Sequence, residues 1–179
     1  MSRRIRRMTV TALMTALLCI AGPMTLPVGP IPLSLGSLVV MLLGMILGAA
    51  GGLQCCGLYL LLGTLGLPVF AGFTGGVMAL LGPTGGFLLG YLPLVLICGW
   101  RKNADRSLWR NMAACIAGHL CLYLMGTLWY HTLTGCTAVA AISVCVLPFL
   151  PGDAVKIVAA VKLGPALHSR LRHAGAQRA

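Results

Sequence analysis

The sequence predicts an all-α integral membrane protein with six membrane-spanning helices and both ends of the chain in the cytoplasm. Of its 179 residues, 59% are hydrophobic and 8% are charged, whereas a soluble domain has roughly 45–50% apolar and about 25% charged residues. The formal net charge is +11. A basic chain can bind nucleic acid, but no polar scaffold lies between the basic clusters, so we exclude that class. We expect one membrane domain over residues 1–179, with a basic N-terminal segment (1–7), a helix bundle (8–167) and a basic tail (168–179).

The first apolar run, Met8–Ala21, follows a segment with four arginines between residues 3 and 7. A basic segment before a short apolar run is also how a secretory signal peptide begins. Here four prolines within residues 23–32 take the place of a small-residue cleavage site, and further hydrophobic segments follow them. We therefore interpret Met8–Ala21 as a retained first membrane helix.

Five further helices are predicted from apolar segments separated by glycine, proline or charged residues. A helix needs about 20 apolar residues to cross the hydrocarbon core of a bilayer. The stretch Ala138–Phe149 is too short, so we expect it to lie near the outer surface or to lead into the last helix. Pro83, Gly85 and Gly86 should loosen the beginning of the fourth helix. The predicted helices are Gly36–Ala50, Leu53–Leu67, Val77–Trp100, Asn111–Leu133 and Gly152–Leu167, connected by a tight turn at Gly51–Gly52 and by the loops Gly22–Leu35, Pro68–Gly76 and Arg101–Arg110.

The distribution of lysine and arginine sets the number of crossings and their direction. With six crossings and a cytoplasmic N-terminus, the cytoplasmic segments carry 12 of the 13 basic residues: four before the first helix, four within 101–110 and four from residue 162 onward. The outer loops carry none. Because cytoplasmic loops of membrane proteins are enriched in lysine and arginine, this pattern favours six helices. Five or seven helices would place one basic cluster outside.

The remaining basic residue, Lys156, stands three residues after Asp153, at the outer end of the last predicted helix. Two residues at this spacing share a helix face. Charged side chains inside membrane segments are costly and tend to face a cavity on a ligand path. We therefore predict that Asp153 and Lys156 form the polar corner of an outward-facing pocket. The alternative is a structural ion pair in which Asp153 caps the N-terminus of the helix.

Two glycine-rich segments, residues 70–76 and 82–87, bracket the beginning of the fourth helix on the outer side. Glycine lets the backbone approach a ligand closely. Small residues also serve helix packing in membranes, and for the second segment packing and pocket formation are equal alternatives. Neither segment has the Gly-x-x-x-x-Gly-Lys-Ser/Thr pattern of a nucleotide site. The substrate-binding candidates in these segments are Thr74, Thr84, Gly85 and Phe87.

A small-x-x-x-small motif occurs in the first helix. Ala12 and Ala16 lie four residues apart, near the cytoplasmic end of this helix. Because such faces let two helices pack closely, we expect Ala12 and Ala16 to contact a partner protein.

The sequence offers little for catalysis or metal binding. Its two acidic residues are Asp105 and Asp153, and no Ser-His-Asp or paired-carboxylate arrangement is recognisable. None of the eight cysteines stands in Cys-x-x-Cys spacing, so we interpret them as small hydrophobic side chains and predict no disulfide, metal or cofactor. His119 lies four residues before Tyr123, and we interpret it as a hydrogen-bonded packing residue. The chain is therefore predicted not to be an enzyme.

Four sequence blocks occur together in an order that is specific to a known family. Over Met8–Leu167 the chain resembles the BioY family, the biotin-specific substrate-binding (S) component of energy-coupling-factor (ECF) transporters. The resemblance implies a six-helix S component in the bacterial cell membrane that binds biotin. It also implies two partners, an ECF transmembrane coupling protein (T component), contacted through the small-residue face of the first helix, and a cytoplasmic ATPase pair. The blocks are Gly29–Leu35, Leu60–Gly72 with Gly-Leu-Pro-Val-Phe, Gly82–Gly90 with Gly-Pro-Thr-Gly-Gly, and Leu150–Lys156 with Pro-Gly-Asp-x-x-Lys.

The resemblance extends to individual residues of the expected site. Asp153 and Lys156 match an aspartate and a lysine that contact the ligand in the family. Asp153 could accept the ureido N–H groups of biotin, Lys156 could meet a carbonyl or carboxylate oxygen, and an apolar wall would hold the ring and tail. Three positions depart from the family pattern and imply an altered affinity or a modified ligand. They are Thr74, where some members have a ligand-contacting asparagine, Phe87, where tyrosine is common, and Gly36, where glutamine often occurs.

Three other functions are weighed against biotin capture. An S component for a thiamine- or riboflavin-type vitamin should offer more aromatic stacking surface than the 6% of aromatic residues here. A membrane-embedded enzyme should show a cluster of acidic residues or histidines near one interface. A channel should show a polar stripe along several helices. The sequence shows neither the cluster nor the stripe.

Overall fold

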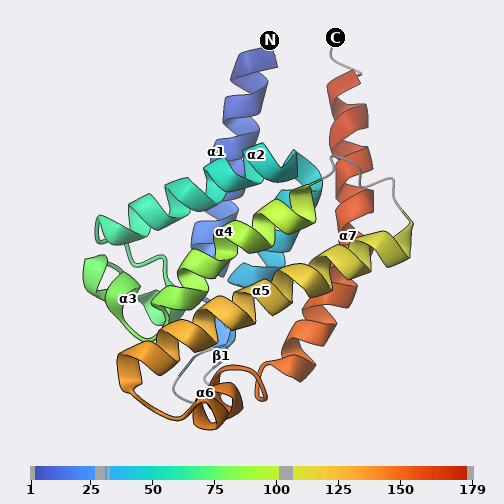
Figure 1. The fold of residues 1–179 in the computed structure, drawn as a ribbon. Helices are drawn as coiled ribbons and strands as arrows, with labels where there is room; N and C mark the ends of the chain where they lie inside the picture. The colour runs from blue at the N-terminus through green and yellow to red at the C-terminus, as the bar shows by residue number, and fades with distance from the viewer. Residues whose placement is uncertain (1–2, 27–30, 32, 101–106, 177–179) are drawn as a thin grey trace.

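In the computed structural model of the protein most of the described chain is helical (Figure 1), which confirms the all-α class. The described residues are 3–26, 31, 33–100 and 107–176, with the backbone alone described at 3, 4, 6, 7 and 171–176. Several residues on which the predictions depend lie outside the described part, namely residues 27–30 and 32 of the proline-rich loop, residues 101–106 of the cytoplasmic loop with Arg101, Lys102, Asp105 and Arg106, and Arg178.

Seven α-helices occur in this part of the chain, together with three short elements between them. The predicted loop Gly22–Leu35 contains a two-residue antiparallel hairpin that the sequence did not predict, in which Thr25 pairs with Ser34 and Leu26 with Leu33. The helices are α1 (Arg3–Ala21), α2 (Gly36–Thr64), α3 (Val77–Leu81), α4 (Gly85–Gly99), α5 (Leu108–Thr134), α6 (Ala138–Cys145) and α7 (Leu150–Ala176), and the short elements are β1 (Thr25–Leu26), β2 (Leu33–Ser34) and the 3-10 turn η1 (Ala71–Phe73).

The second and third predicted helices together form α2, which is broken at Gly48. The predicted turn at Gly51–Gly52 is wrong, because both of these residues are helical. Gly48 has φ 74° and ψ 177°, a backbone conformation that is essentially restricted to glycine. Gly52 instead packs against the Val95 side chain of α4, and this contact requires a small residue within a continuing helix.

Replacing Gly48 with alanine should lower the free energy of unfolding by about 1–3 kcal/mol, because a Cβ strains this backbone conformation. Gly57→Ala, in the same element, is the matched control, since a Cβ there would meet no atom within 4 Å. The control should be neutral or stabilising by up to about 1 kcal/mol, as expected for alanine in a helix. Thermal unfolding of the detergent-solubilised variants measures both effects, and equal stabilities of the two would contradict the assigned bend.

Two further breaks agree with the sequence. The predicted fourth helix is interrupted between α3 and α4 at residues 82–84, where its beginning was expected to loosen. The short apolar stretch after α5 forms α6 and then leads into α7, with the two helices bent by 50° relative to each other. Both alternatives for this stretch are therefore met, because it leads into the last helix and lies at the end of the bundle opposite the two chain ends (Figure 1).

The described helices have the length and surface of a membrane protein. By length and composition, α2 and α5 are long and apolar enough to cross a bilayer, and the bent pair α6 and α7 would count as a third span. The apolar helices Met8–Ala21 and Gly85–Gly99 are shorter, and α2 contains two predicted segments on either side of Gly48. The six predicted segments are thus α1, the two parts of α2, α4, α5 and α7. Many large apolar side chains are exposed on these helices, which suits contact with lipid.

Both chain ends lie at the same end of the helix bundle, and several connecting segments lie at the other end (Figure 1). Helix α2 packs against α1, α4 and α7, and α4 packs against α5. Figure 1 shows α1 beginning and α7 ending at the top of the view, whereas β1, α3 and the connection from α5 to α6 lie at the opposite end. With both chain ends in the cytoplasm, this opposite end is the outer one. Helix α7 begins there, with Asp153 in its first turn.

Candidate functional site

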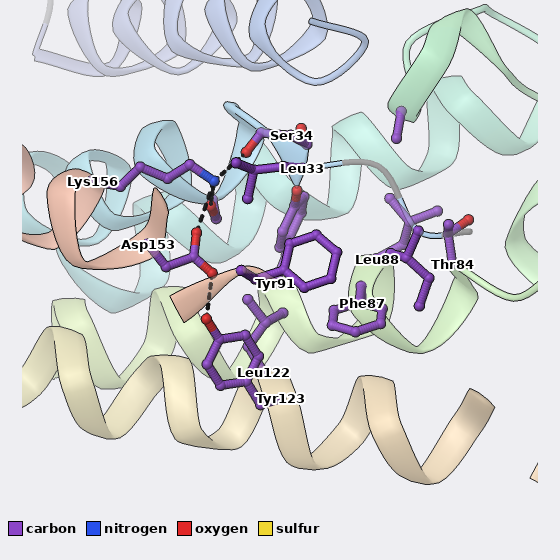
Figure 2. A pocket seen from close by; sticks show the side chains of 14 residues that line it. Leu33, Ser34, Thr84, Phe87, Leu88, Tyr91, Leu122, Tyr123, Asp153 and Lys156 are labelled. Atoms are coloured by element: carbon purple, nitrogen blue, oxygen red, sulfur yellow. Dashed lines mark hydrogen bonds and ion pairs between the residues drawn. The ribbon is translucent and has the colours of Figure 1, made fainter. Parts of the chain in front are cut away.

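A cavity lies at the outer end of the bundle, where α2, α4, α5 and α7 meet the hairpin. Its empty volume, including the mouth, is about 510 Å³. Figure 2 shows the charged residues of α7 at one end of the cavity and the side chains of α4 and α5 along its wall. The lining residues are Ile31, Leu33, Ser34, Ser37, Ala71, Thr84, Phe87, Leu88, Tyr91, Leu122, Tyr123, Phe149, Asp153 and Lys156.

Asp153 and Lys156 form a buried ion pair at the polar end of this cavity. The Nζ atom of Lys156 lies 2.8 Å from Oδ1 of Asp153, and the two residues are 7% and 5% exposed, respectively. Helix α7 begins at Leu150, and the backbone N–H of Asp153 donates to the Phe149 carbonyl at 2.8 Å. Asp153 therefore stands in the first turn rather than at the N-cap, so the capping part of the structural alternative is wrong.

Neighbouring elements satisfy the remaining polar groups of the pair (Figure 2). The Lys156 ammonium also donates to the Ser34 carbonyl at 2.6 Å and to the Ser37 hydroxyl at 3.2 Å. The Tyr123 hydroxyl, from α5, donates to Oδ2 of Asp153 at 2.6 Å. A buried ion pair is stable only when its remaining hydrogen-bonding groups are also satisfied. The hairpin, α2 and α5 thus complete the hydrogen bonding of the pair.

The rest of the cavity wall is apolar and partly aromatic. The rings of Phe87 and Phe149 approach each other with their centroids 6.4 Å apart. Tyr91 is buried beside them, and Leu88 and Leu122 complete the wall on α4 and α5. An apolar wall with a few polar groups at one end is the usual arrangement of a site for a small organic ligand.

The sequence-predicted candidates lie partly in this cavity. Thr84 and Phe87 line it together with Asp153 and Lys156. Thr74 is exposed, and its hydroxyl donates to the Ala71 carbonyl at 3.0 Å, so Ala71 rather than Thr74 reaches the cavity.

Gly85, Ala12 and Ala16 lie away from the cavity. Gly85 is buried at the beginning of α4, and a Cβ there would collide with the Leu80 carbonyl, so this glycine serves close packing. Ala12 and Ala16 lie on an exposed face of α1. Ligand binding by the cavity residues and partner contact by the α1 face stay predictions.

At Gly36, where the family often has glutamine, the structure leaves little space for a side chain. A Cβ at this buried position would lie 2.7 Å from the Tyr91 hydroxyl oxygen and 3.1 Å from Oγ of Ser34. The Ser34 hydroxyl is itself fixed, because it accepts from the Gly36 N–H at 2.9 Å and donates to the Gly22 carbonyl at 2.8 Å. The site therefore has no space for a glutamine side chain here unless Tyr91 moves.

Sequence reasoning missed the residues that complete the polar end. Ser34, Ser37 and Tyr123 were not candidates. The interpretation of His119 as a hydrogen-bonded packing residue agrees with the structure, in which it is buried and its Nδ1 lies 3.2 Å from the Cys115 carbonyl oxygen. The available signal was the spacing of His119 and Tyr123, which places two polar side chains on one face of a membrane helix. A carboxylate inside a membrane needs donors, and Tyr123 on this face supplies one.

No metal centre is found among the described residues, where no three histidine, cysteine or acidic side chains gather. All eight cysteines are free thiols. The Sγ atoms of Cys98 and Cys115 lie 3.9 Å apart between α4 and α5, which is too far for a covalent bond.

Comparison with known proteins places this cavity in a family. The model of the family described as BioY matches residues 1–173. The chain is 36% identical over 156 residues to a protein of Pyrococcus horikoshii named probable biotin transporter BioY, covering 87% of this chain and 92% of the relative. It is 34% identical over 169 residues to the biotin transporter BioY2 of Lactococcus lactis subsp. cremoris, covering 93% and 92%.

A solved structure has the same fold. The crystal structure of the S component for biotin from an ECF-type ABC transporter superposes with a TM-score of 0.85, covers 94% of this chain and 95% of its own, and is 26% identical in sequence. The family match extends over nearly the whole chain, and the relatives are aligned over nearly their whole length. This chain therefore belongs to the BioY family and is a multi-pass protein of the cell membrane.

Proposed function

We propose that this chain is the biotin-binding membrane subunit of an ECF-type vitamin importer, which captures biotin outside the cell and releases it inside. The observation that carries the proposal is the cavity at the outer end of the bundle, with the buried Asp153–Lys156 pair at the end of an apolar wall. The relatives named as biotin transporters and the solved biotin S component support biotin as the ligand.

The chemistry of biotin matches the two parts of this cavity. Its fused ring is rigid and largely apolar, which suits the wall formed by Phe87, Phe149 and Tyr91. Its ureido group has two N–H donors and one carbonyl acceptor, and its tail ends in a carboxylate. Asp153 supplies acceptor oxygens and Lys156 supplies donors, so the polar end can bind either end of the ligand.

One observation favours a second ligand class. Aromatic residues are scarce in the chain, but Phe87, Tyr91, Tyr123 and Phe149 all line the cavity. The cavity therefore offers the stacking surface that the composition alone did not predict, and a flat heterocyclic vitamin is the alternative ligand.

Calorimetric titration of the detergent-purified protein tests the proposal. We expect tight binding of one biotin per chain and no heat with thiamine or riboflavin. A protein that is shown to be folded but binds riboflavin or thiamine in place of biotin would overturn the assignment of the ligand. Absence of binding to all three would direct attention to the departures at Thr74, Phe87 and Gly36.

Import requires partners that the chain does not contain. No nucleotide-binding motif occurs in the sequence, so a cytoplasmic ATPase pair would supply the energy, and a transmembrane T component would couple it to this chain. We propose that residues 1–179 act as one membrane domain within that assembly. The exposed small-residue face of α1, with Ala12 and Ala16, would pack against the T component in the bilayer.

Ala12→Leu should reduce biotin uptake by cells strongly, because a large side chain prevents close approach of a second helix. Biotin binding by the purified variant should be unchanged, since α1 contributes no residue to the cavity lining. Ala117→Leu, at an exposed alanine of α5, is the matched control and should retain uptake. Radiolabelled biotin uptake at equal expression measures the effect, and full uptake by Ala12→Leu would remove this face as the coupling contact.

A further inference from the structure

His119 lies beneath the polar end of the cavity with one ring nitrogen unused. The residue is 3% exposed. Its Nε2 atom has no hydrogen-bond partner among the described residues and lies 3.9 Å from Oδ2 of Asp153. Its Nδ1 atom lies 3.2 Å from the Cys115 carbonyl oxygen, one turn earlier on α5. A buried polar atom without a partner is costly, so this nitrogen requires an explanation.

The contact of Nδ1 determines which protonation states of His119 fit. A carbonyl oxygen can only accept, so Nδ1 must carry a hydrogen to bond to Cys115. In the neutral ring Nε2 then presents a lone pair toward the Asp153 carboxylate, which is unfavourable. In the protonated ring Nε2 carries a hydrogen as well and can donate to Asp153 after a small movement. A proton on Nε2 would therefore be held between His119 and the Asp153 carboxylate, whose Oδ2 lies 3.9 Å away.

The hydrogen bonds of Lys156 indicate under which condition a positive charge on His119 is favourable. An ammonium group has three N–H donors, and those of Lys156 are all engaged, with Asp153, Ser34 and Ser37. An anionic or carbonyl oxygen of a ligand can therefore bind Lys156 only by displacing one of these acceptors. If Lys156 turns from Asp153 to the ligand, the buried carboxylate loses its countercharge, which is strongly unfavourable.

Protonation of His119 would restore the charge balance. The ionisable groups that face it are Asp153 and Lys156 on α7 and Tyr123 on α5, and the ring centroids of His119 and Tyr123 are 6.0 Å apart. With neutral His119 the polar end has no net charge, and the proton makes it positive by one. A ligand with one carboxylate then makes the polar end neutral again.

We propose that His119 is a positioning residue that takes up a proton when the ligand binds and then holds Asp153 in place of Lys156. The inference rests on the proposed function, because it takes biotin as the ligand. Lys156 is thereby released to bind the ligand oxygen, and the affinity for biotin rises as the pH falls. The carboxylate of biotin is already ionised near neutral pH, so it does not contribute to this pH dependence.

The direct test is the number of protons taken up on binding. Biotin is titrated into the detergent-purified wild-type protein by calorimetry near pH 7, in several buffers with different enthalpies of ionisation. We expect the observed heat to vary with the buffer enthalpy, with a slope that corresponds to uptake of up to about one proton per biotin. By linkage, the Kd should then rise by up to about tenfold per pH unit in the range where free His119 is neutral.

His119→Gln keeps a polar side chain of similar length but cannot take up a proton. This variant should bind biotin more weakly than the wild type at about pH 6, and its Kd should change little between about pH 6 and about pH 8. His131→Gln makes the same substitution on the same helix at a residue outside the cavity lining, and it should keep the wild-type pH profile.

The possible results separate this inference from the proposed function. Biotin binding with a heat that is independent of the buffer would overturn the role of His119 while leaving the proposed function intact. A pH profile of His119→Gln that equals the wild-type profile would do the same. Absence of biotin binding by the folded wild type in every buffer would contradict the proposed function, and the inference with it.

Discussion

Lys156→Met should weaken biotin binding by at least about 30-fold, because truncating one partner of a buried charge pair costs about 2–5 kcal/mol. The ligand loses its cationic donor, and Asp153 is left as an uncompensated charge at the end of the cavity. Calorimetric titration or competition binding in detergent measures the loss.

Lys162→Met is the matched control for this variant. It makes the same substitution on α7 at an exposed position six residues further along, and it should bind biotin as the wild type does. Wild-type affinity in a folded Lys156→Met protein would show that the ammonium has a structural role alone, since the ligand would then not depend on it.

Asp153→Asn should have an effect of similar size on binding and a larger one on stability. The substitution leaves the Lys156 ammonium buried without a countercharge, with only neutral acceptors such as the Ser34 carbonyl and the Ser37 hydroxyl. Breaking a buried ion pair in this way destabilises a protein by about 3–5 kcal/mol. We expect a lower thermal stability and at least about 30-fold weaker biotin binding.

The double variant Asp153→Asn with Lys156→Met separates the two effects. It removes both buried charges, so it should recover much of the stability that either single variant loses. It should not recover biotin binding, because both groups that we propose to bind the ligand are absent. Recovery of tight binding in the double variant would show that the pair is only a structural ion pair, which is the alternative reading of the sequence.

Several elements of the site could be predicted from local pattern. Asp153 and Lys156 were identified because charged side chains inside a membrane segment are costly and tend to face a cavity on a ligand path. Thr84 and Phe87 were identified from the glycine-rich segment, and the structure places both in the cavity lining. Thr74 and Gly85 carried the same local signal but lie outside the lining, because the turn at η1 and the packing on Leu80 direct them elsewhere.

The sequence by itself determined the membrane environment, the helical class and the six-segment count, because these depend on composition, hydropathy and the distribution of basic residues along the chain. It could not locate the bend of α2. Glycines occur at 44, 48, 51 and 52, and only the contacts of α2 with α4 decide which of them leaves the helix.

The tertiary structure alone decided the membership of the site. Ser34 comes from the hairpin, Ser37 from α2 and Tyr123 from α5. Each lies 30 or more positions along the chain from the charged residue that it contacts. The physical reason is that the hydrogen-bonding partners of a buried ion pair are the groups close to it in the folded chain, whatever their separation in sequence. The residues next to Ser34 in the sequence do not indicate that the Lys156 ammonium group donates to its carbonyl.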